Sequence, residues 1–356
     1  MRTRIWSAVV VALLLTACGG GTAASPTESA AANDTGPITV ALYGGAFGDA
    51  ITSCIVKPFT QKTGIQVTPE VGVSSITLSK LQQQKGNPLI DVAWMDGGVS
   101  EVADSSGVVE AIDTKQLSNF SHVNPKAVYK DSAGNVFALS GGFYGFGLLY
   151  NTQKVNPAPT SWNDLWSSQY VGKVTTPDPS NAMGLPFIVT ISELNHGSAT
   201  DINPGLQKLK ALNAISYYKT AGISENLFTS GEAVIGAGYA SSAFSLADKG
   251  APVGYAVPKE GALAGDIRVH EVKGTKHPGA SLKFIDYTIS KDAQSCMAQT
   301  LYTAPVNDQV TLPDKAKARM PWGASGSMAN LKIPNWTQIN EHRSDWSDQF
   351  NKQVLG

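Results

Sequence analysis

Aromatic and acidic side chains stand where predicted strands end in the N-terminal part of the chain. Tyr43 ends one apolar run, Phe47 lies in the glycine-rich loop that follows it, and Asp96 follows another apolar run. Tyr144 lies farther on, in a stretch of glycines and aromatic residues. A carboxylate beside aromatic faces can compensate an organic cation for the water that it loses on burial. These four residues are therefore candidates for contacting a positively charged group.

A second group of polar side chains follows two later predicted strands. Asp178, Ser180 and Asn181 lie in a loop before a predicted helix, and Tyr239 and Ser241 lie at the end of another apolar run. Asp178 is nearly as compatible with a solvated loop acid as with a ligand contact. Ser180 can cap the following helix, and a capping serine can also present helix amides to an anion. The sequence leaves these alternatives open.

Residue types used in catalysis and metal binding show no matching pattern. None of the five histidines stands at a spacing typical of a metal site. The chain contains no Gly-x-Ser-x-Gly elbow, no phosphate-binding loop and no recognisable pair of catalytic carboxylates. We therefore expect neither an enzyme nor a bound metal or cofactor. A secreted hydrolase remains an alternative, because missing motifs exclude enzymes poorly.

The elements that must position the candidates alternate between apolar runs and amphipathic segments. Apolar runs at 37–43, 66–70 and 90–94 predict strands, and the segments 49–63 and 74–84 predict helices. The same alternation returns after residue 172. The pattern predicts an α/β fold with a mostly parallel sheet covered by helices on both faces. Ligands bind such sheets outside the carboxyl ends of the strands, where the first group of candidates lies.

The N-terminus has the order of an export signal. Arg2 and Arg4 precede an apolar run over 5–15, which is too short to span a bilayer. Leu-Thr-Ala before Cys18 resembles the lipobox of bacterial lipoproteins, which implies lipidation of Cys18 and a membrane anchor. The alternative is a plain signal peptide cut near Ala24. Either interpretation places the protein outside the cytoplasm.

Composition bounds the rest of the chain. Residues 18–36 are rich in Gly, Ala, Ser and Thr, and we interpret them as a flexible tether. The net charge of −1 includes the two arginines of residues 1–17, which hold no acid, so the remainder carries −3. No basic cluster indicates a nucleic-acid partner. A chain of this length usually divides into two lobes.

Two cysteines remain after Cys18. Cys54 and Cys296 are far apart in sequence, which excludes a compact zinc knuckle. Outside the cytoplasm they can form a disulfide or remain separate buried thiols. The residues alone do not decide between these states.

Several segments taken together resemble the extracellular solute-binding proteins of ABC importers, most closely the spermidine/putrescine-binding branch. They occur in the same order as in that family and cover nearly the whole chain after the tether: KPFTQKTGIQV, IDVAWMD, GFGLLYNT, PTSWNDLW, GKVTTPDPSNAMG, SGEAVIGAGYASSA, VGYAVPKEG, ASLKFIDYTISKDAQ and YTAPVN. The resemblance implies a two-lobed periplasmic-binding-protein-like fold of type II, with two hinge crossings and a ligand cleft. The implied partners are a small solute and the permease subunits of an importer, bound by a monomer.

The resemblance also implies lobe boundaries. The first lobe comprises 37–145 and 264–307, and the second comprises 146–263 and 308–356. Cys54 and Cys296 then share a lobe, which favours a disulfide between them. Proteins of the same fold can also serve as sensors that take no part in transport.

Three further ligand candidates come from the resemblance alone. Asp266 matches the family's acid after the PKEG motif, Glu260 lies within that motif, and Tyr302 matches a cleft tyrosine. The chain departs from polyamine binders at residues 263–265, where Leu-Ala-Gly offers no aromatic ring. The loop that holds Asp178 also has one acid instead of two. A polyamine or related amine is favoured, with an amino acid-like solute, an aminophosphonate, a sugar or a metal ion as alternatives.

Overall fold

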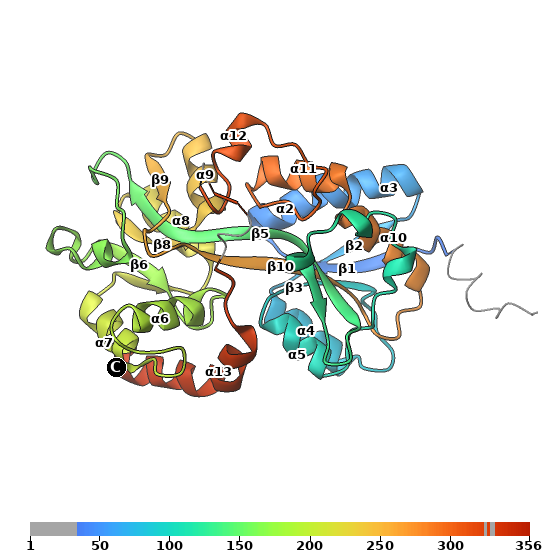
Figure 1. Cartoon of the computed structure of the whole chain (residues 1–356), viewed down its shortest axis with the longest axis horizontal. Helices are drawn as coiled ribbons and strands as arrows, with labels where there is room; N and C mark the ends of the chain where they lie inside the picture. The colour runs from blue at the N-terminus through green and yellow to red at the C-terminus, as the bar shows by residue number, and fades with distance from the viewer. Residues whose placement is uncertain (1–33, 324–325, 328–331) are drawn as a thin grey trace, which may run out of the picture.

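The computed structural model describes residues 34–323, 326–327 and 332–356. The predicted leader, the predicted lipidation residue Cys18 and most of the predicted tether lie outside the described residues. The described chain forms two lobes that lie side by side along the longest axis of the molecule (Figure 1). Both lobes contain the predicted alternation of strands and helices.

The first lobe is built on three parallel strands. β1 (Ile38–Leu42) lies between β2 (Val67–Val71) and β3 (Val92–Asp96). The helices that follow these strands are α2 (Gly45–Ile51), α3 (Lys57–Thr63), α4 (Ser74–Gln83) and α5 (Val99–Ser105). The carboxyl ends of β1 and β3 bring Tyr43 and Asp96 to the same edge, as the sequence predicts.

The helix predicted over 49–63 is interrupted in the middle. A π turn at Thr52–Val56 separates α2 from α3. Pro58 follows this turn and has no amide hydrogen to donate to the carbonyl of Cys54. A π turn relieves such an interruption without ending the helix.

Two long strands connect the lobes. β5 (Val136–Asn151) and β10 (Leu263–Glu271) pair in antiparallel orientation, and β10 also pairs with β3. β4 (Val128–Lys130) pairs with the first half of β5. A side chain at Gly141 in β5 would enter the ring of Trp94, so this buried position requires glycine.

The second lobe repeats the arrangement of the first. β6 (Val174–Pro177) lies between β7 (Ser216–Tyr218) and β8 (Ile235–Tyr239) in parallel orientation, while β8 and β9 (Val253–Ala256) pair with β5 in antiparallel orientation. A ten-stranded sheet therefore continues through both lobes. Its strand pairs are parallel within each lobe and antiparallel around β5 and β10, so the expectation of a mostly parallel sheet was wrong at the crossing.

Helices cover the second lobe and the returning C-terminal part. The second lobe contains α6 (Gly184–Glu193), α7 (Asn203–Leu212), α8 (Ala221–Ser230) and α9 (Ala240–Asp248). The chain returns through α10 (Pro278–Thr288), α11 (Lys291–Thr300), α12 (Asp314–Lys317) and α13 (Trp336–Phe350), and a final π turn spans Asn351–Leu355. Short 3₁₀ turns lie at Thr114–Gln116, Phe120–His122, Pro125–Ala127, Trp162–Trp166 and Ser168–Tyr170. Ser161 caps the turn that begins at Trp162.

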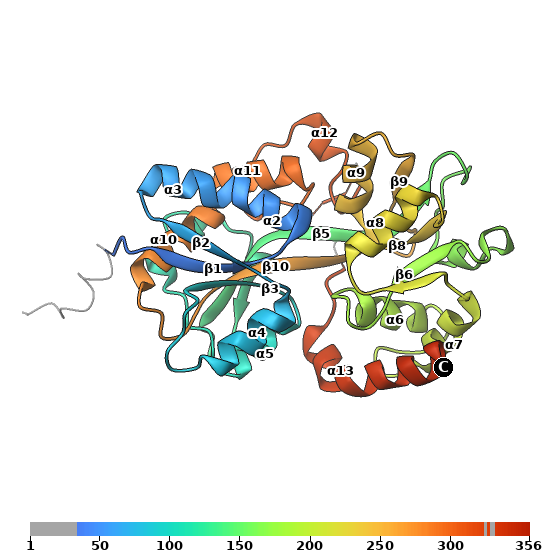
Figure 2. The ribbon, with the colours of Figure 1, turned by 180° about the vertical axis from the view of Figure 1, so that it is seen from behind.

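Helix α13 contacts both lobes (Figure 2). Near its beginning, the amide of Asn340 donates to the carbonyl of Gly98 in the first lobe at 2.6 Å. At its end, the ring of Phe350 packs edge-on against Tyr217 in the second lobe, with 5.3 Å between centroids. Helix α13 lies in the segment 308–356, which the resemblance places in the second lobe, and it contacts residues of both lobes.

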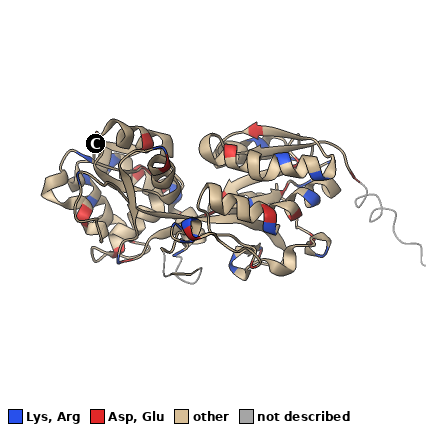
Figure 3. Cartoon of the chain, turned by 90° about the horizontal axis from the view of Figure 1, so that it is seen from above, with Lys and Arg blue, Asp and Glu red and all other residues tan. Residues whose placement is uncertain are grey.

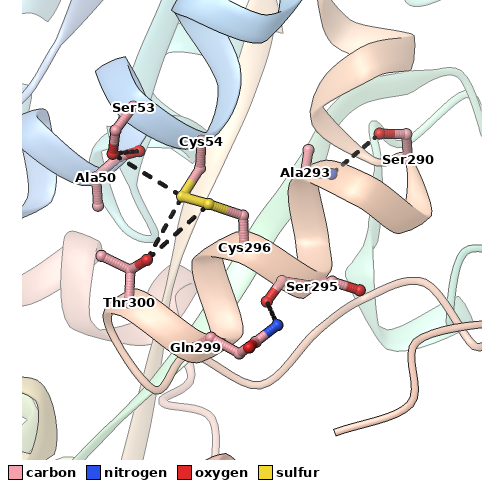
Figure 4. The surroundings of a disulfide bond; sticks show 9 residues. All are labelled: Ala50, Ser53, Cys54, Ser290, Ala293, Ser295, Cys296, Gln299 and Thr300. Atoms are coloured by element: carbon pink, nitrogen blue, oxygen red, sulfur yellow. Dashed lines mark hydrogen bonds between the residues drawn. A yellow bond between two sulfur atoms is a disulfide. The ribbon is translucent and has the colours of Figure 1, made fainter.

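A disulfide joins Cys54 to Cys296 within the first lobe (Figure 4). Their Cα atoms are 5.5 Å apart, and the bond links the π turn after α2 to α11. Cys54 is buried, and its sulfur also contacts the Thr300 hydroxyl at 3.6 Å. The disulfide thereby fixes the end of α2, the helix that carries Phe47.

The surface carries mixed charge. Along the ribbon in Figure 3, lysines and arginines are interspersed with acids over both lobes. Within the described ranges, no helix is long and apolar enough to cross a membrane. The same residues contain no group of three or more side chains suited to holding a metal ion.

Candidate ligand-binding site

The three aromatic residues of the first group meet Tyr239 of the second group where the lobes join. The rings of Tyr43 and Phe47 lie 6.1 Å apart, and those of Phe47 and Tyr144 lie 6.2 Å apart. Tyr144 then meets Tyr239 of the second lobe at 5.4 Å. We call Tyr43, Phe47, Tyr144 and Tyr239 the aromatic arc. Each contact is edge-on, the arrangement that the charge distribution of aromatic rings favours.

Asp96 lies beside the aromatic arc. The Ser74 hydroxyl donates to its carboxylate at 2.7 Å, and the Tyr144 hydroxyl lies at 3.4 Å. The side chain forms no ion pair with a described residue. Burial, together with the charge of Asp266, raises the pKa of Asp96 to about 6, against the lowering effect of the Ser74 hydrogen bond. A bound cation would offset much of the free-energy cost of keeping this carboxylate ionised away from water.

Asp266 is present at the same site but is already paired. Its side chain is fully buried, and one oxygen accepts a hydrogen bond from Arg268 Nε at 2.9 Å. Arg268 also pairs with Glu101 at 2.6 Å and lies over the Tyr129 ring at 3.4 Å. The other oxygen of Asp266 is buried without a hydrogen-bond partner among the described residues. Asp266 can therefore accept one more donor, but Arg268 already compensates much of its charge.

Gly265 explains how Tyr144 reaches this site. A side chain at Gly265 would overlap the phenol of Tyr144, because the two residues face each other across β10 and β5. The Leu263-Ala264-Gly265 sequence, which departs from the family pattern by lacking a ring, thus makes room for the ring of Tyr144 on the neighbouring strand.

The loop before α6 contributes through Asn181 and not through its acid. Tyr239 donates its hydroxyl to Asn181 Oδ1 at 2.7 Å. Asp178 accepts the backbone amide of Ser180 at 2.8 Å and the Ser180 hydroxyl at 2.5 Å, so its carboxylate stabilises its own loop. Ser180 is exposed, and its hydroxyl is used in this contact. Ser241 is buried in the first turn of α9, two residues after Tyr239.

Two predicted ligand residues use their polar groups in contacts within the chain. Glu260 accepts the Ser161 hydroxyl at 2.5 Å and the Trp162 amide at 3.2 Å, so both of its oxygens fix the 3₁₀ turn in the second lobe. Tyr302 donates its hydroxyl to Asp248 at 2.7 Å. Because their polar groups are satisfied by other parts of the chain, we remove Glu260 and Tyr302 from the candidate site.

Comparison with known proteins identifies the family. The model of a family described as bacterial extracellular solute-binding protein matches residues 87–342, which is more than half of the chain. The chain is a bacterial extracellular solute-binding protein. The expected family and the two-lobed fold are thereby confirmed.

Individual relatives agree with this family. The Spermidine/putrescine-binding periplasmic protein of Escherichia coli (strain K12) is 24% identical over 293 residues, covering 77% of this chain and 83% of the relative. A crystal structure of an ABC transporter from Clostridium perfringens ATCC 13124 has a TM-score of 0.73 and 22% identity, over 89% of this chain and 99% of the other. The structure titled Atu4243-GABA receptor has a TM-score of 0.74 and 21% identity, over 88% and 96%.

One residue beside the candidate site of this solute-binding protein was not predicted from the sequence. Trp336 at the start of α13 is buried against Gly97 and Gly98, the loop directly after Asp96. Its indole nitrogen has no hydrogen-bond partner among the described residues. Trp336 contacts residues more than 200 positions away in sequence, so no local pattern predicts its place beside the site. The only sequence signal is that it lies in a C-terminal segment that contains several tryptophans.

Proposed function

We propose that this solute-binding protein captures a small organic amine at Asp96 and delivers it to the permease of an ABC importer. Asp96 carries the proposal, because it is a partly buried acid with no positively charged partner among the described residues. A carboxylate in this state is costly unless a bound cation replaces the lost hydration.

The aromatic arc supports the choice of an organic cation. Tyr43, Phe47, Tyr144 and Tyr239 surround the approach to Asp96 with rings whose faces attract cations and whose carbon atoms suit methylene groups. An inorganic cation would need several oxygen ligands instead. The rings therefore favour an amine with a carbon chain over a metal ion.

The names of the relatives are consistent with this ligand class. One relative is named for spermidine and putrescine, and one structural neighbour is named for GABA. All three solutes contain an amino group. The position of Tyr239 opposite Tyr144 supports binding between the lobes, with residues of each lobe contacting the same solute.

We further propose that the protein acts as a monomer anchored through a lipid on Cys18. The predicted tether then leaves both lobes accessible to the permease. A Cys18→Ser substitution is expected to release the protein from the membrane fraction. Retention of the variant in that fraction would refute the anchor without affecting the proposed ligand.

A thermal-shift and calorimetric screen tests the ligand. The chain from residue 34 onward is mixed with putrescine, spermidine and GABA, with glucose and succinate as solutes that lack an amine. An amine at 100 times its Kd is expected to stabilise the fold by about 2.7 kcal/mol. Asp96→Asn should abolish this stabilisation, while Asp308→Asn, at an exposed acid that contacts His122, should leave it unchanged. Equal stabilisation by glucose, or an amine response that survives Asp96→Asn, would refute the proposal.

A further inference from the structure

A second cluster joins the two lobes through Tyr302. This residue follows α11 of the first lobe, and its hydroxyl donates to Asp248 at the end of α9 in the second lobe at 2.7 Å. Its ring also meets the ring of Phe244, one turn earlier on α9, with 5.3 Å between centroids. Tyr302 thus holds the same helix at two points.

Two cations complete the cluster. Arg319 pairs with Asp248 at 2.9 Å, and its guanidinium lies 4.8 Å from the Tyr302 ring centre and 4.9 Å from the Phe244 ring centre. Lys315 of α12 lies 3.1 Å from the same carboxylate. The Tyr302 hydrogen bond is the largest of the effects that lower the pKa of Asp248 to about 2, so this acid is ionised at every pH of physiological interest.

The backbone of Tyr302 is adapted to this contact. Its φ of 57° lies in the left-handed region, which is unusual for a residue with a large side chain. The turn ends α11 and directs the chain back to β5, where Ala304 and Phe143 exchange hydrogen bonds of 2.7 and 3.1 Å. Only 5% of the residue is exposed. Unusual backbone conformations persist where surrounding contacts hold them.

Helix α9 connects this cluster to the candidate ligand site. Tyr239 of the aromatic arc immediately precedes the helix, Ser241 lies in its first turn, and Asp248 is its last residue. Figure 2 shows α12 between α9 and α11, so the cluster lies where the lobes approach each other. A shift of α9 relative to the first lobe would move Tyr239 away from Tyr144.

We propose that Tyr302, Asp248 and Arg319 form an interlobe latch that positions α9, and with it Tyr239, for ligand binding. Tyr302 acts as a positioning residue and not as a ligand contact. The effect on affinity rests on the proposed amine-binding function, whereas the effect on lobe geometry does not.

Distance measurements without ligand test the geometry. Spin labels on cysteines introduced at the exposed positions Gln83 in α4 and Lys210 in α7 report the separation of the lobes. Tyr302→Phe keeps the ring and removes the hydroxyl, and Asp248→Asn removes the charge. Each is expected to add a longer component to the distance distribution. Asp308→Asn, which removes the charge of an exposed acid that contacts His122, is the matched control and should preserve the original distribution.

Calorimetry with putrescine then tests the consequence for binding. Each latch variant is expected to weaken binding about 3- to 10-fold, the size expected for losing one hydrogen bond. The double variant should lose less than the product of the two single effects, because both remove the same contact. If Tyr302→Phe folds poorly, Asp248→Asn supplies the same test from the solvent-exposed partner.

The outcomes distinguish failure of the interlobe latch from failure of the proposed amine-binding function. Unchanged lobe distances in both variants would overturn the latch, whatever the protein binds. Altered distances with unchanged putrescine affinity would overturn the positioning role of Tyr302. Absence of amine binding in the unmodified protein would refute the proposed function, while the distance measurement would still decide whether the latch exists.

Discussion

Binding of an amine is expected to weaken as the pH falls through the range in which Asp96 becomes protonated. Burial raises the pKa of Asp96 to about 6, and the neighbouring Asp266 contributes to the rise. An ammonium group binds the ionised carboxylate, so protonation of Asp96 competes with the ligand. The fraction of ionised Asp96 falls from about nine-tenths at pH 7 to about one-tenth at pH 5.

The magnitude follows from that fraction. The Kd for putrescine should rise about tenfold between pH 7 and pH 5, since the amine keeps its charge throughout this range. An ordinary aspartate with a pKa of 3.8 would change the Kd by less than about 10% over the same interval. The steepness of the pH dependence therefore distinguishes a buried acid from an exposed one.

Isothermal titration calorimetry at constant ionic strength measures this effect. Near pH 6, binding should release about half a proton, which is detected by repeating the titration in buffers of different ionisation enthalpy. In Asp96→Asn both the pH dependence and the proton release should disappear. A Kd that stays constant from pH 5 to pH 7, or a dependence that persists in the variant, would refute the assignment of Asp96 as the anchoring acid.

Three predictions concern stability. Burial, with the charges of Glu110 and Asp113, raises the pKa of Glu271 to about 8, so the folded state retains a proton that the unfolded chain releases. The free energy of unfolding should therefore fall by about 1 to 3 kcal/mol as the pH rises from 5 to 8. Urea titrations of Glu271→Gln should lack this dependence on pH. Reduction of the disulfide that joins α11 to the π turn should cost about 2 to 5 kcal/mol, and an unchanged melting temperature under reducing conditions would contradict this. Arg268→Met should cost about 3 to 5 kcal/mol, because it leaves Asp266 buried without its partner, and Asp266→Asn in the same chain should restore part of the loss.

The sequence predicts the elements of this fold better than their contacts. The helix predicted over 74–84 matches α4 (Ser74–Gln83) to within one residue. By contrast, α7 is absent from the predicted elements. Its first residues are Asn203-Pro-Gly, a combination typical of turns, and the buried leucines that decide its structure pack against α6.

In the candidate site, too, the positions of the elements are predicted better than the side-chain contacts. Asp96 and Tyr43 are predicted correctly as neighbours because strand ends at one sheet edge must lie together. Glu260 and Tyr302 come from positions in a family pattern, and their polar groups bind Ser161 and Asp248, which are 99 and 54 residues away in sequence. No local pattern records such distant side-chain pairings, so the sequence cannot show that these groups are already occupied.

The path of the chain through the two lobes determines the order in which they can be completed. Nearly all of the second lobe lies between the two passages of β5 and β10, so it is available as one piece once residue 263 has emerged. The first lobe must wait longer, because β3 pairs with β10 and the segment from α10 to α11 arrives after it. Until then the backbone groups of β3 on that side remain unpaired, as on the edge of an open sheet. A newly made chain is therefore exposed to mispairing at residues 92–96, although most of this strand is buried in the finished protein.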